Sequence, residues 1–155
     1  RTPCPCGHRG APRRACRCSP DRVARCQAKL SGPLLDRIDL HVEVPALAPQ
    51  ELLQASAGEA SAVVRSRVAL ARQRALQRQG APNQALHGQQ IDAQARLEPA
   101  AAQFLQTAAA RLGWAARATH RALKVARTIA DLAGAESTQV AHVAEAMQYR
   151  RTLHD

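Results

Sequence analysis

Aromatic residues are almost absent from this chain of 155 residues: Phe104, Trp114 and Tyr149 are the only three. Nucleic-acid-binding modules that stack several bases on several rings, such as the RNA-recognition motif and the OB fold, are therefore disfavoured. No run approaches the roughly 20 apolar residues that cross a bilayer, and no basic stretch leads into an apolar signal segment. The sequence predicts a soluble, cytoplasmic protein without a membrane partner.

A second absence concerns nucleotide binding. The chain has no Gly-x-x-x-x-Gly-Lys-Ser/Thr loop to hold phosphates and no apolar strand that ends in paired acids to hold Mg²⁺. We therefore expect this chain alone neither to bind ATP tightly nor to hydrolyse it. Its first residue is Arg1 rather than Met, and we expect it to be part of a longer polypeptide.

Positive charge, in contrast, is abundant and unevenly placed. The 22 Lys and Arg residues outnumber 12 Asp and Glu, and the formal net charge of +10 favours a polyanionic partner. Residues 1–30, which we call the arm, contain eight of the basic residues, a single acid and all five cysteines. The arm has too few apolar residues for a core, so we expect it to be irregular. Its candidate nucleic-acid contacts are Arg13, Arg14, Arg17 and Arg22.

The cysteines of the arm form two close pairs. Cys4 and Cys6 are separated by one residue, as are Cys16 and Cys18. Four thiolates in two pairs can enclose a tetrahedral zinc ion, and nearby basic side chains help to keep them deprotonated. The one-residue gap is tighter than usual, and His8 or Cys26 could replace one of the four. Free reduced thiols and, less readily in a cytosolic setting, disulfides are the alternatives.

The rest of the chain predicts one strand followed by four helices. Residues 38–44 alternate between apolar and polar side chains, which is typical of a strand, but no second strand pattern exists for it to pair with. Alanine-rich segments with helical periodicity follow at 49–80, with a break near Gly58, and then at 98–112, 115–133 and from 137 onward, with a loop at 81–90. The predicted fold is mainly α: an irregular cysteine-bearing arm, one unpaired strand and a four-helix bundle.

We expect each long helix to bury one stripe of apolar side chains. The stripes are Val64, Val68, Ala71 and Ala75 on the first helix; Ala118, Ala122, Val125 and Ile129 on the third; and Val140, Val143, Ala144 and Met147 on the fourth. Arg65, Arg67, Arg72, Arg74 and Arg78 form a basic side on the first helix. That side could follow a phosphate backbone, although a charged helix face is more often simply solvated.

Several blocks of the sequence, in order, resemble the magnesium-chelatase-like AAA+ ATPases, in particular the ComM/YifB competence-protein family. They are the cysteine pairs, residues 30–45 (LSGPLLDRIDLHVEVP), residues 118–132 (ATHRALKVARTIADL) and residues 146–150 (AMQYR). The resemblance covers nearly the whole chain. It implies three parts: the arm at 1–30, an arginine-finger segment with the last strand of an ATPase core at 31–48, and a helical lid at 49–155.

The resemblance also implies roles for particular residues. Arg37 resembles the arginine finger that reaches the γ-phosphate held by a neighbouring subunit of a hexameric ring, where a planar guanidinium stabilises the transferring phosphoryl group. Arg117 resembles the sensor-2 arginine of the lid, with Arg121 and Lys124 as alternative nucleotide contacts. ATP and Mg²⁺ would be cofactors of the full-length protein, and DNA the substrate of the motor.

Two other functions compete with a DNA motor. The chain could be a stand-alone nucleic-acid-binding module, in which zinc stabilises the basic arm and the helices support it. It could also belong to an ATPase subunit of a metal chelatase that acts on a porphyrin. The paired cysteines resemble the ComM branch of the family and favour the motor over the chelatase.

Overall fold

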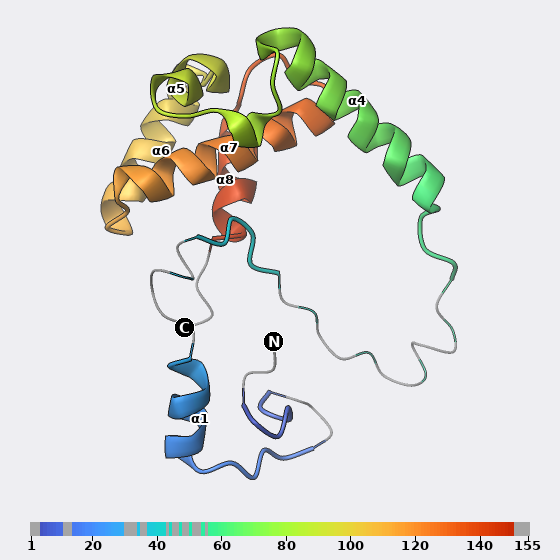
Figure 1. Cartoon of the computed structure of the whole chain (residues 1–155), viewed down its shortest axis with the longest axis vertical. Coiled ribbons are helices and arrows are strands. Elements are labelled where there is room, and N and C mark those ends of the chain that lie inside the picture. The colour runs from blue at the N-terminus through green and yellow to red at the C-terminus, as the bar shows by residue number, and fades with distance from the viewer. Residues whose placement is uncertain are drawn as a thin grey trace. The chain divides into compact units, whose positions relative to one another are not determined.

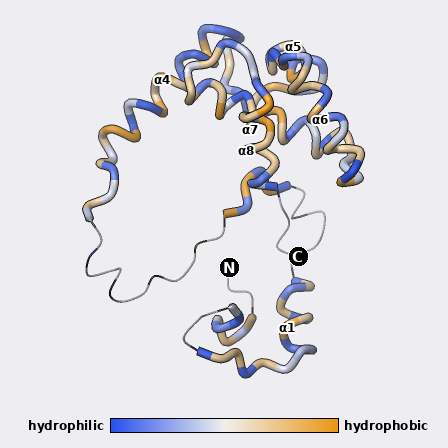
Figure 2. Tube along the Cα trace, turned by 180° about the vertical axis from the view of Figure 1, so that it is seen from behind, coloured by the Kyte–Doolittle hydropathy of each residue, from blue (hydrophilic) through white to orange (hydrophobic). Residues whose placement is uncertain are grey.

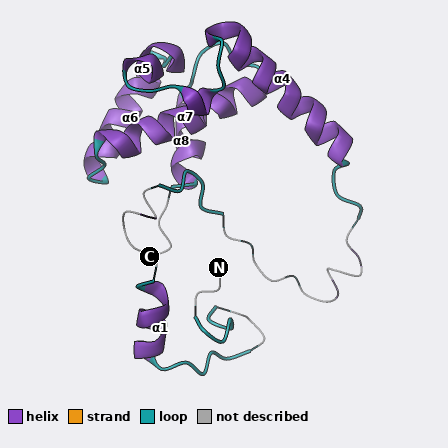
Figure 3. Ribbon diagram, in the orientation of Figure 1, coloured by secondary structure: helices purple, strands orange, loops and turns teal. Residues whose placement is uncertain are grey.

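The computed structural model describes residues 4–10, 14–29, 34, 37–42, 44, 47, 50, 54 and 56–150. The chain divides into two compact units, one made of Arg1–Ile38 with Glu43–Gln54 and the other of Asp39–Val42 with Ala55–Asp155. Figure 3 shows that the described residues are mainly helical, as the sequence predicts. None of their helices is both long and apolar enough to cross a bilayer.

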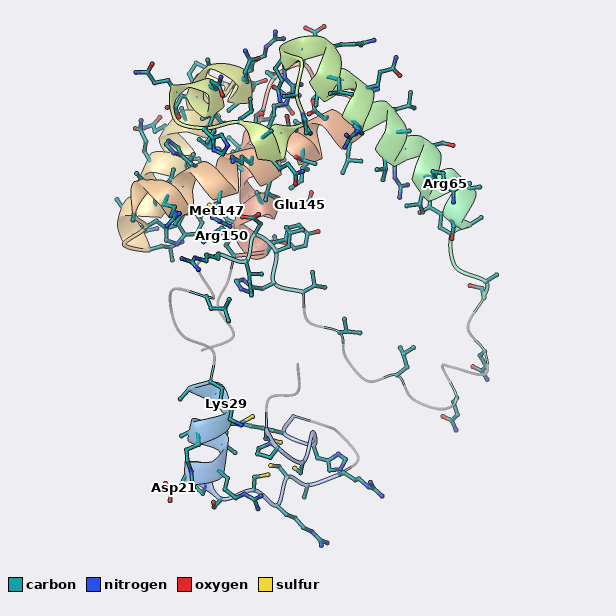
Figure 4. All side chains as sticks on the ribbon, viewed as in Figure 1. Asp21, Lys29, Arg65, Glu145, Met147 and Arg150 are labelled. Atoms are coloured by element: carbon teal, nitrogen blue, oxygen red, sulfur yellow. The ribbon has the colours of Figure 1, made fainter. Side chains whose placement is uncertain are left out.

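Helix α1 (Pro20–Gln27) belongs to the first unit and lies in a segment for which the sequence predicted an irregular arm. Proline is favoured in a first helical turn because its missing N–H would have no partner there, and Asp21 complements the positive end of the helix. Val23 is the buried residue of the helix. Figure 4 shows Asp21 and Lys29 at opposite ends of this segment.

The second unit contains the remaining described helices, which we call the bundle (Figure 1). They are α4 (Ser61–Gln79), the 3₁₀ turn η1 (Asn83–Ala85), α5 (Gln89–Ala95), α6 (Pro99–Arg111), α7 (Ala116–Ala133) and α8 (Val140–Gln148). Helix α7 is central, because α4, η1, α5 and α8 all pack against it, while α6 packs against α8.

The helix predictions for the C-terminal half of the chain are confirmed to within a few residues. Helix α6 corresponds to the predicted 98–112, α7 to 115–133, and α8 begins three residues after Ser137. Helix α4 begins only at Ser61, beyond the predicted break near Gly58. The four-helix count was wrong for the described residues, since α5 is an additional helix that begins inside the predicted loop at 81–90.

The core of the bundle is made of aliphatic side chains from α5, α6, α7 and α8 and of Leu86, which follows η1. Its buried members are Leu86, Ile91, Ala95, Ala101, Leu105, Leu123, Ala126, Val143 and Ala146. Figure 2 shows apolar residues running along α7 and α8. The many alanines let the helix axes approach closely, but they bury little area each, so the core relies on a few larger side chains.

The buried stripe predicted for α4 is only half correct. Ala71 and Ala75 are buried, whereas Val68 is 52% exposed. The first half of α4 extends away from α7, and Figure 4 shows Arg65 on that projecting part. Val63 and Leu70 are exposed there as well, so this part of the helix has no apolar partner among the described residues.

The strand predicted at 38–44 is not found: the described residues 37–42 and 44 are irregular. Ile38, Leu40, Val42 and Val44 are all exposed. A strand needs a neighbouring strand for its backbone groups and a packed layer for its apolar face, and the described residues provide neither. Their one β-type pairing is a parallel bridge between Leu97 and Thr138.

A polar cluster, defined here as Arg78, Asn83, Arg127, Asp131 and Thr138, is buried where α4, η1 and α7 meet, and it extends through Arg127 to Thr138 in the segment before α8. Arg78 Nη1 donates to Asp131 Oδ1 at 2.6 Å, Arg127 Nη2 donates to the same oxygen at 2.9 Å, and Asn83 Nδ2 donates to Asp131 Oδ2 at 2.8 Å. Burial alone would raise the pKa of Asp131, but the hydrogen bonds from Arg78 and Asn83 and the charge of Arg127 lower it. The carboxylate is therefore held in its charged form.

The polar cluster also corrects the reading of α4 as a helix with a basic outer side. Arg78 is inside the cluster, and Arg74 Nη1 donates to the Asp131 carbonyl at 2.6 Å. Arg67 pairs with Glu59 at 2.9 Å on the surface. Three of the five arginines of that side are thus engaged within the chain. The α4 face is a poor candidate for following a phosphate backbone.

Gly134 ends α7 and helps to place Arg74. Its φ of 75° lies in the left-handed region, which favours glycine. A Cβ at this position would lie 3.2 Å from Arg74 Nη2. Glycine therefore allows both the turn and the approach of the arginine to the end of α7.

Candidate metal centre and arginine sites

The four cysteines predicted as metal ligands come together in the structure. The sulfur atoms of Cys4, Cys6, Cys16 and Cys18, which we call the thiol cluster, all lie within 4.8 Å of one another. Three Sγ–Sγ distances are 3.3 Å (Cys4 to Cys6), 3.7 Å (Cys6 to Cys16) and 3.6 Å (Cys16 to Cys4). Figure 4 shows the sulfur atoms gathered in the arm.

These distances fit a tetrahedral metal ion. With Zn–S bonds of about 2.3 Å, the sulfurs of a tetrahedral site lie about 3.8 Å apart. All five cysteines are free thiols, and neither His8 nor Cys26 belongs to the described group of candidate ligands. Of the alternatives left open by the sequence, the ligand set of the two close pairs is the one that the geometry favours.

The loop that carries the first pair is shaped to hold sulfur anions. The Gly7 N–H donates to the Cys4 carbonyl at 3.1 Å, and the φ of Gly7 is 77°. This tight turn directs the backbone N–H of His8 to the Cys6 sulfur, which is the main reason why the pKa of Cys6 is lowered to about 6. Burial alone would raise the pKa of Cys4, but the backbone N–H groups that follow the turn lower it.

The pKa values of the second pair, Cys16 and Cys18, are raised rather than lowered. The backbone N–H of Cys18 lowers the pKa of Cys16, but burial and the neighbouring sulfurs outweigh it and raise the pKa to about 11. The pKa of Cys18 is also raised, since the effect of the Cys6 backbone is outweighed by the Cys6 sulfur. Like charges cannot all form in so small a space without a cation. A divalent metal would release these protons when it binds, and its affinity would rise with pH.

The surface of the arm around the thiol cluster is basic. Arg14, Arg17 and Arg22 are exposed, as expected for phosphate contacts, and Arg13 lies outside the described residues. A shallow depression beside Cys16 and Cys18 is lined by Arg9, Val23 and Gln27. The arm therefore combines a candidate metal site with several exposed guanidinium groups.

Arg37, the predicted arginine finger, is exposed, and its backbone N–H donates to the Leu34 carbonyl at 3.0 Å. A finger acts on a nucleotide held by another subunit, so a single chain does not test this role. It stays a prediction.

The three candidate nucleotide contacts on α7 differ in their surroundings. Arg121 Nη1 donates to Asp39 Oδ1 at 2.6 Å, and Lys124 Nζ donates to the Gln84 carbonyl at 2.9 Å. Arg117, in the first turn of α7, is exposed and has no polar partner among the described residues. The geometry favours Arg117 as the arginine available to a nucleotide.

The buried pair of Arg127 and Asp131 is the feature that sequence reasoning missed. Arg127 is only 1% exposed and bridges Asp131 to the Ala135 and Glu136 carbonyls at 2.6 Å and 2.9 Å. A signal was present, because both residues lie at helical spacing on the same face as the buried Leu123. Opposite charges four residues apart within an apolar stripe indicate a buried pair.

The chain thus combines a helical bundle with a cysteine-bearing basic arm. Comparison with known protein families shows which family it belongs to. The family model described as magnesium chelatase, subunit ChlI C-terminal, matches residues 58–150, and the model described as magnesium chelatase, subunit ChlI, matches residues 1–52. The chain belongs to this magnesium chelatase family.

Individual similar proteins show which branch of this family the chain resembles. The competence protein ComM of Haemophilus influenzae is 45% identical over 136 residues, which cover 86% of this chain and 26% of ComM. YifB of Salmonella typhimurium is 43% identical over 135 residues, covering 86% and 27%. Mb2921c of Mycobacterium bovis is 39% identical over 154 residues, covering 97% and 30%. The resemblance to the ComM/YifB family is confirmed, and the chain spans under a third of the length of these relatives.

Proposed function

We propose that this chain is the C-terminal part of a cytoplasmic AAA+ ATPase that moves DNA, and that it provides an arginine finger and a nucleotide-sensing lid to a hexameric ring. The observation that carries the proposal is the state of three basic residues on α7: Arg121 and Lys124 are engaged within the chain, and Arg117 is exposed at the start of the helix. The similarity to a protein named for competence supports DNA as the substrate.

In this proposal the chain's own residues act on nucleotides bound elsewhere. Arg37 reaches the γ-phosphate held by the neighbouring subunit and spreads positive charge over the transferring oxygens. Arg117 contacts the nucleotide of its own subunit, so that the position of the lid follows the nucleotide state. ATP and Mg²⁺ are bound by the part of the full-length protein that carries the phosphate-binding loop.

The full-length protein with Arg37→Ala tests the finger. We expect turnover to fall by about 10³-fold, while binding of a fluorescent ATP analogue is retained. Arg117→Ala should weaken that binding. Arg111→Ala removes an exposed arginine from the last turn of α6 and is the control, for which both quantities should stay at the wild-type level. Wild-type turnover in assembled Arg37→Ala rings would refute the finger role.

A second function for the arm is supported by the thiol cluster and its basic surroundings. We propose that a bound zinc ion fixes the two loops of the arm and thereby orders Arg14, Arg17 and Arg22 for contact with DNA phosphates. The metal supplies cross-linking here and takes no part in ATP hydrolysis. Since the unbound arm has few apolar contacts, metal binding would supply much of its folding free energy.

Fluorescence anisotropy with a labelled single-stranded DNA tests the arm. Changing Arg14, Arg17 and Arg22 together to Ser should weaken binding and reduce the slope of log K against log salt by about 2 to 3, and EDTA should weaken wild-type binding. Changing three exposed arginines of the bundle, Arg65, Arg72 and Arg111, to Gln provides the control. An equal loss of slope in the control would attribute DNA binding to overall charge and remove the specific role of the arm.

A further inference from the structure

The four residues Asp39–Val42 belong to the same compact unit as the bundle, although residues 43–54 separate them from the rest of that unit in the sequence. They follow Arg37 after one intervening residue. Figure 1 shows this segment passing the C-terminal end of α8. A segment next to the proposed finger is therefore in direct contact with the lid.

Two hydrogen bonds among the described residues connect the segment to α7 and to the end of α8. Asp39 Oδ1 accepts a hydrogen bond from Arg121 Nη1 of α7 at 2.6 Å, and the side chains are 55% and 23% exposed, respectively. The His41 N–H donates to the carbonyl of Tyr149, the residue that caps α8, at 2.7 Å. An exposed ion pair alone restrains little. Two anchor points two residues apart fix both the position and the direction of the segment.

The imidazole of His41 gives a second, independent indication of function. Both of its ring nitrogens are covered from water and have no hydrogen-bond partner among the described residues. Buried polar atoms are nearly always paired, because water is lost without replacement when they are not. The docked arrangement thus includes one unfavourable element, which suits a contact that opens and closes rather than a permanent part of the core.

We infer that Arg121 is a positioning residue, and that the contacts of Asp39 and His41 form a latch that couples the lid to the arginine finger of the same subunit. The inference rests on the proposed function. Arg117 and Arg121 are neighbours on one face of α7, since residues four apart lie about 5 to 6 Å apart between Cβ atoms. On the other side of the latch, two residues of extended chain span at most about 7 Å between Arg37 and Asp39.

The latch links the two nucleotide sites that one subunit serves. A movement of α7 that follows the nucleotide at Arg117 displaces Arg121, which pulls Asp39 and with it the residue that reaches the neighbouring subunit. Arg121 thereby transmits the state of one site to the next without touching either nucleotide.

Amide hydrogen exchange of this chain tests the latch directly. Asp39→Asn and Arg121→Gln should each speed the exchange of the His41 amide by about fivefold, the size expected for loss of a partly exposed ion pair, while the amides of Leu123 and Ala126 in the core keep their rates. Glu136→Gln is the control, since Glu136 is exposed and its carboxylate has no partner among the described residues. An unchanged rate at His41 in Asp39→Asn would overturn the latch.

The full-length protein tests the coupling. Asp39→Asn and Arg121→Lys should lower turnover by about fivefold and leave the affinity for an ATP analogue unchanged, and Arg37→Ala combined with Asp39→Asn should be no slower than Arg37→Ala alone. The charge reversal Asp39→Arg with Arg121→Asp should recover turnover. Loss of nucleotide affinity in Arg121→Lys, as in Arg117→Ala, would make Arg121 a nucleotide contact and overturn the inference. Normal turnover in Arg37→Ala would overturn the proposed finger as well, whereas normal turnover in Asp39→Asn alone would overturn only the latch.

Discussion

Replacing Asp131 with Asn should greatly lower the free energy of unfolding of the bundle. The carboxylate accepts hydrogen bonds from Arg78, Arg127 and Asn83, and only 2% of its side chain is exposed. The substitution keeps the volume but removes the charge, and it directs a new N–H₂ group at donors. Removing one partner of a buried ion pair costs about 3 to 5 kcal/mol. Because Arg127 retains two carbonyl acceptors, we expect a loss at the lower end of this range, about 3 kcal/mol in the free energy of unfolding.

The loss can be measured by urea denaturation at pH 7, with helix content followed by circular dichroism. For a domain of this size a loss of about 3 kcal/mol corresponds to a fall in Tm of about 12 to 24 °C. Asp92→Asn, at an exposed carboxylate on α5, is the control and should change the free energy of unfolding by less than about 0.5 kcal/mol. A double-mutant cycle with Arg127→Met should give a coupling energy of about 1 to 3 kcal/mol.

The result that would refute this reasoning is a loss below about 1 kcal/mol in Asp131→Asn with an unchanged m-value. The bundle would then tolerate two buried arginines without their carboxylate, which would mean that water reaches the polar cluster. An m-value that falls together with stability would instead report a change in the unfolding transition itself, and calorimetry would separate the two cases.

Three further predictions concern the bundle. Gly134→Ala should lower the free energy of unfolding by about 1 to 2 kcal/mol because of the left-handed φ, and by a further amount because of the contact with Arg74. Gly80→Ala is the control: its φ is 73° and nothing lies within 4 Å of a Cβ, so it should show only the loss due to φ. Equal losses for the two variants in urea denaturation would contradict the contact. Thr138→Val removes the hydroxyl that donates to the Ala95 carbonyl at 2.6 Å and should cost about 1 to 3 kcal/mol; full stability by the same assay would show that Ala95 finds another donor. The pKa of Asp131 is lowered in the folded state, so its contribution to the free energy of unfolding is complete above the unfolded pKa of about 3.9 and is lost as the pH falls through the lower folded value. As the pH falls from 6 to 2, the urea midpoint should therefore decrease more steeply for the wild type than for Asp131→Asn. Parallel curves would argue against a lowered pKa.

Features set by local chemistry could be predicted from the sequence. Glycines that follow apolar periodicity marked the ends of α4 and α7, because glycine readily adopts the left-handed backbone that closes a helix in its own turn. The thiol cluster was predicted for the same reason. Two pairs of cysteines on short loops need only one fold-back of the chain to meet.

Features that depend on distant partners were harder to predict. The alternation at 38–44 is a strand pattern, but a strand forms only where a neighbour accepts its hydrogen bonds. Helix α5 was missed because its seven residues are mostly polar and it ends at Arg96, with φ 46°, rather than at a glycine. Arg127 was missed because a charged residue is expected at the surface. Only the fold shows that a buried carboxylate and two carbonyl groups accept hydrogen bonds from it.

The polar cluster also affects how the bundle transmits force. Apolar helix faces can slide past one another in small steps, because the dispersion energy given up at one place is recovered at the next. Directional bonds between α4 and α7 do not allow such sliding without first breaking. Asp131 lies 14 residues beyond Arg117, about 21 Å along the helix, so α7 is clamped at one end and exposed at the other. It should behave as a stiff lever whose movement is set by its clamp.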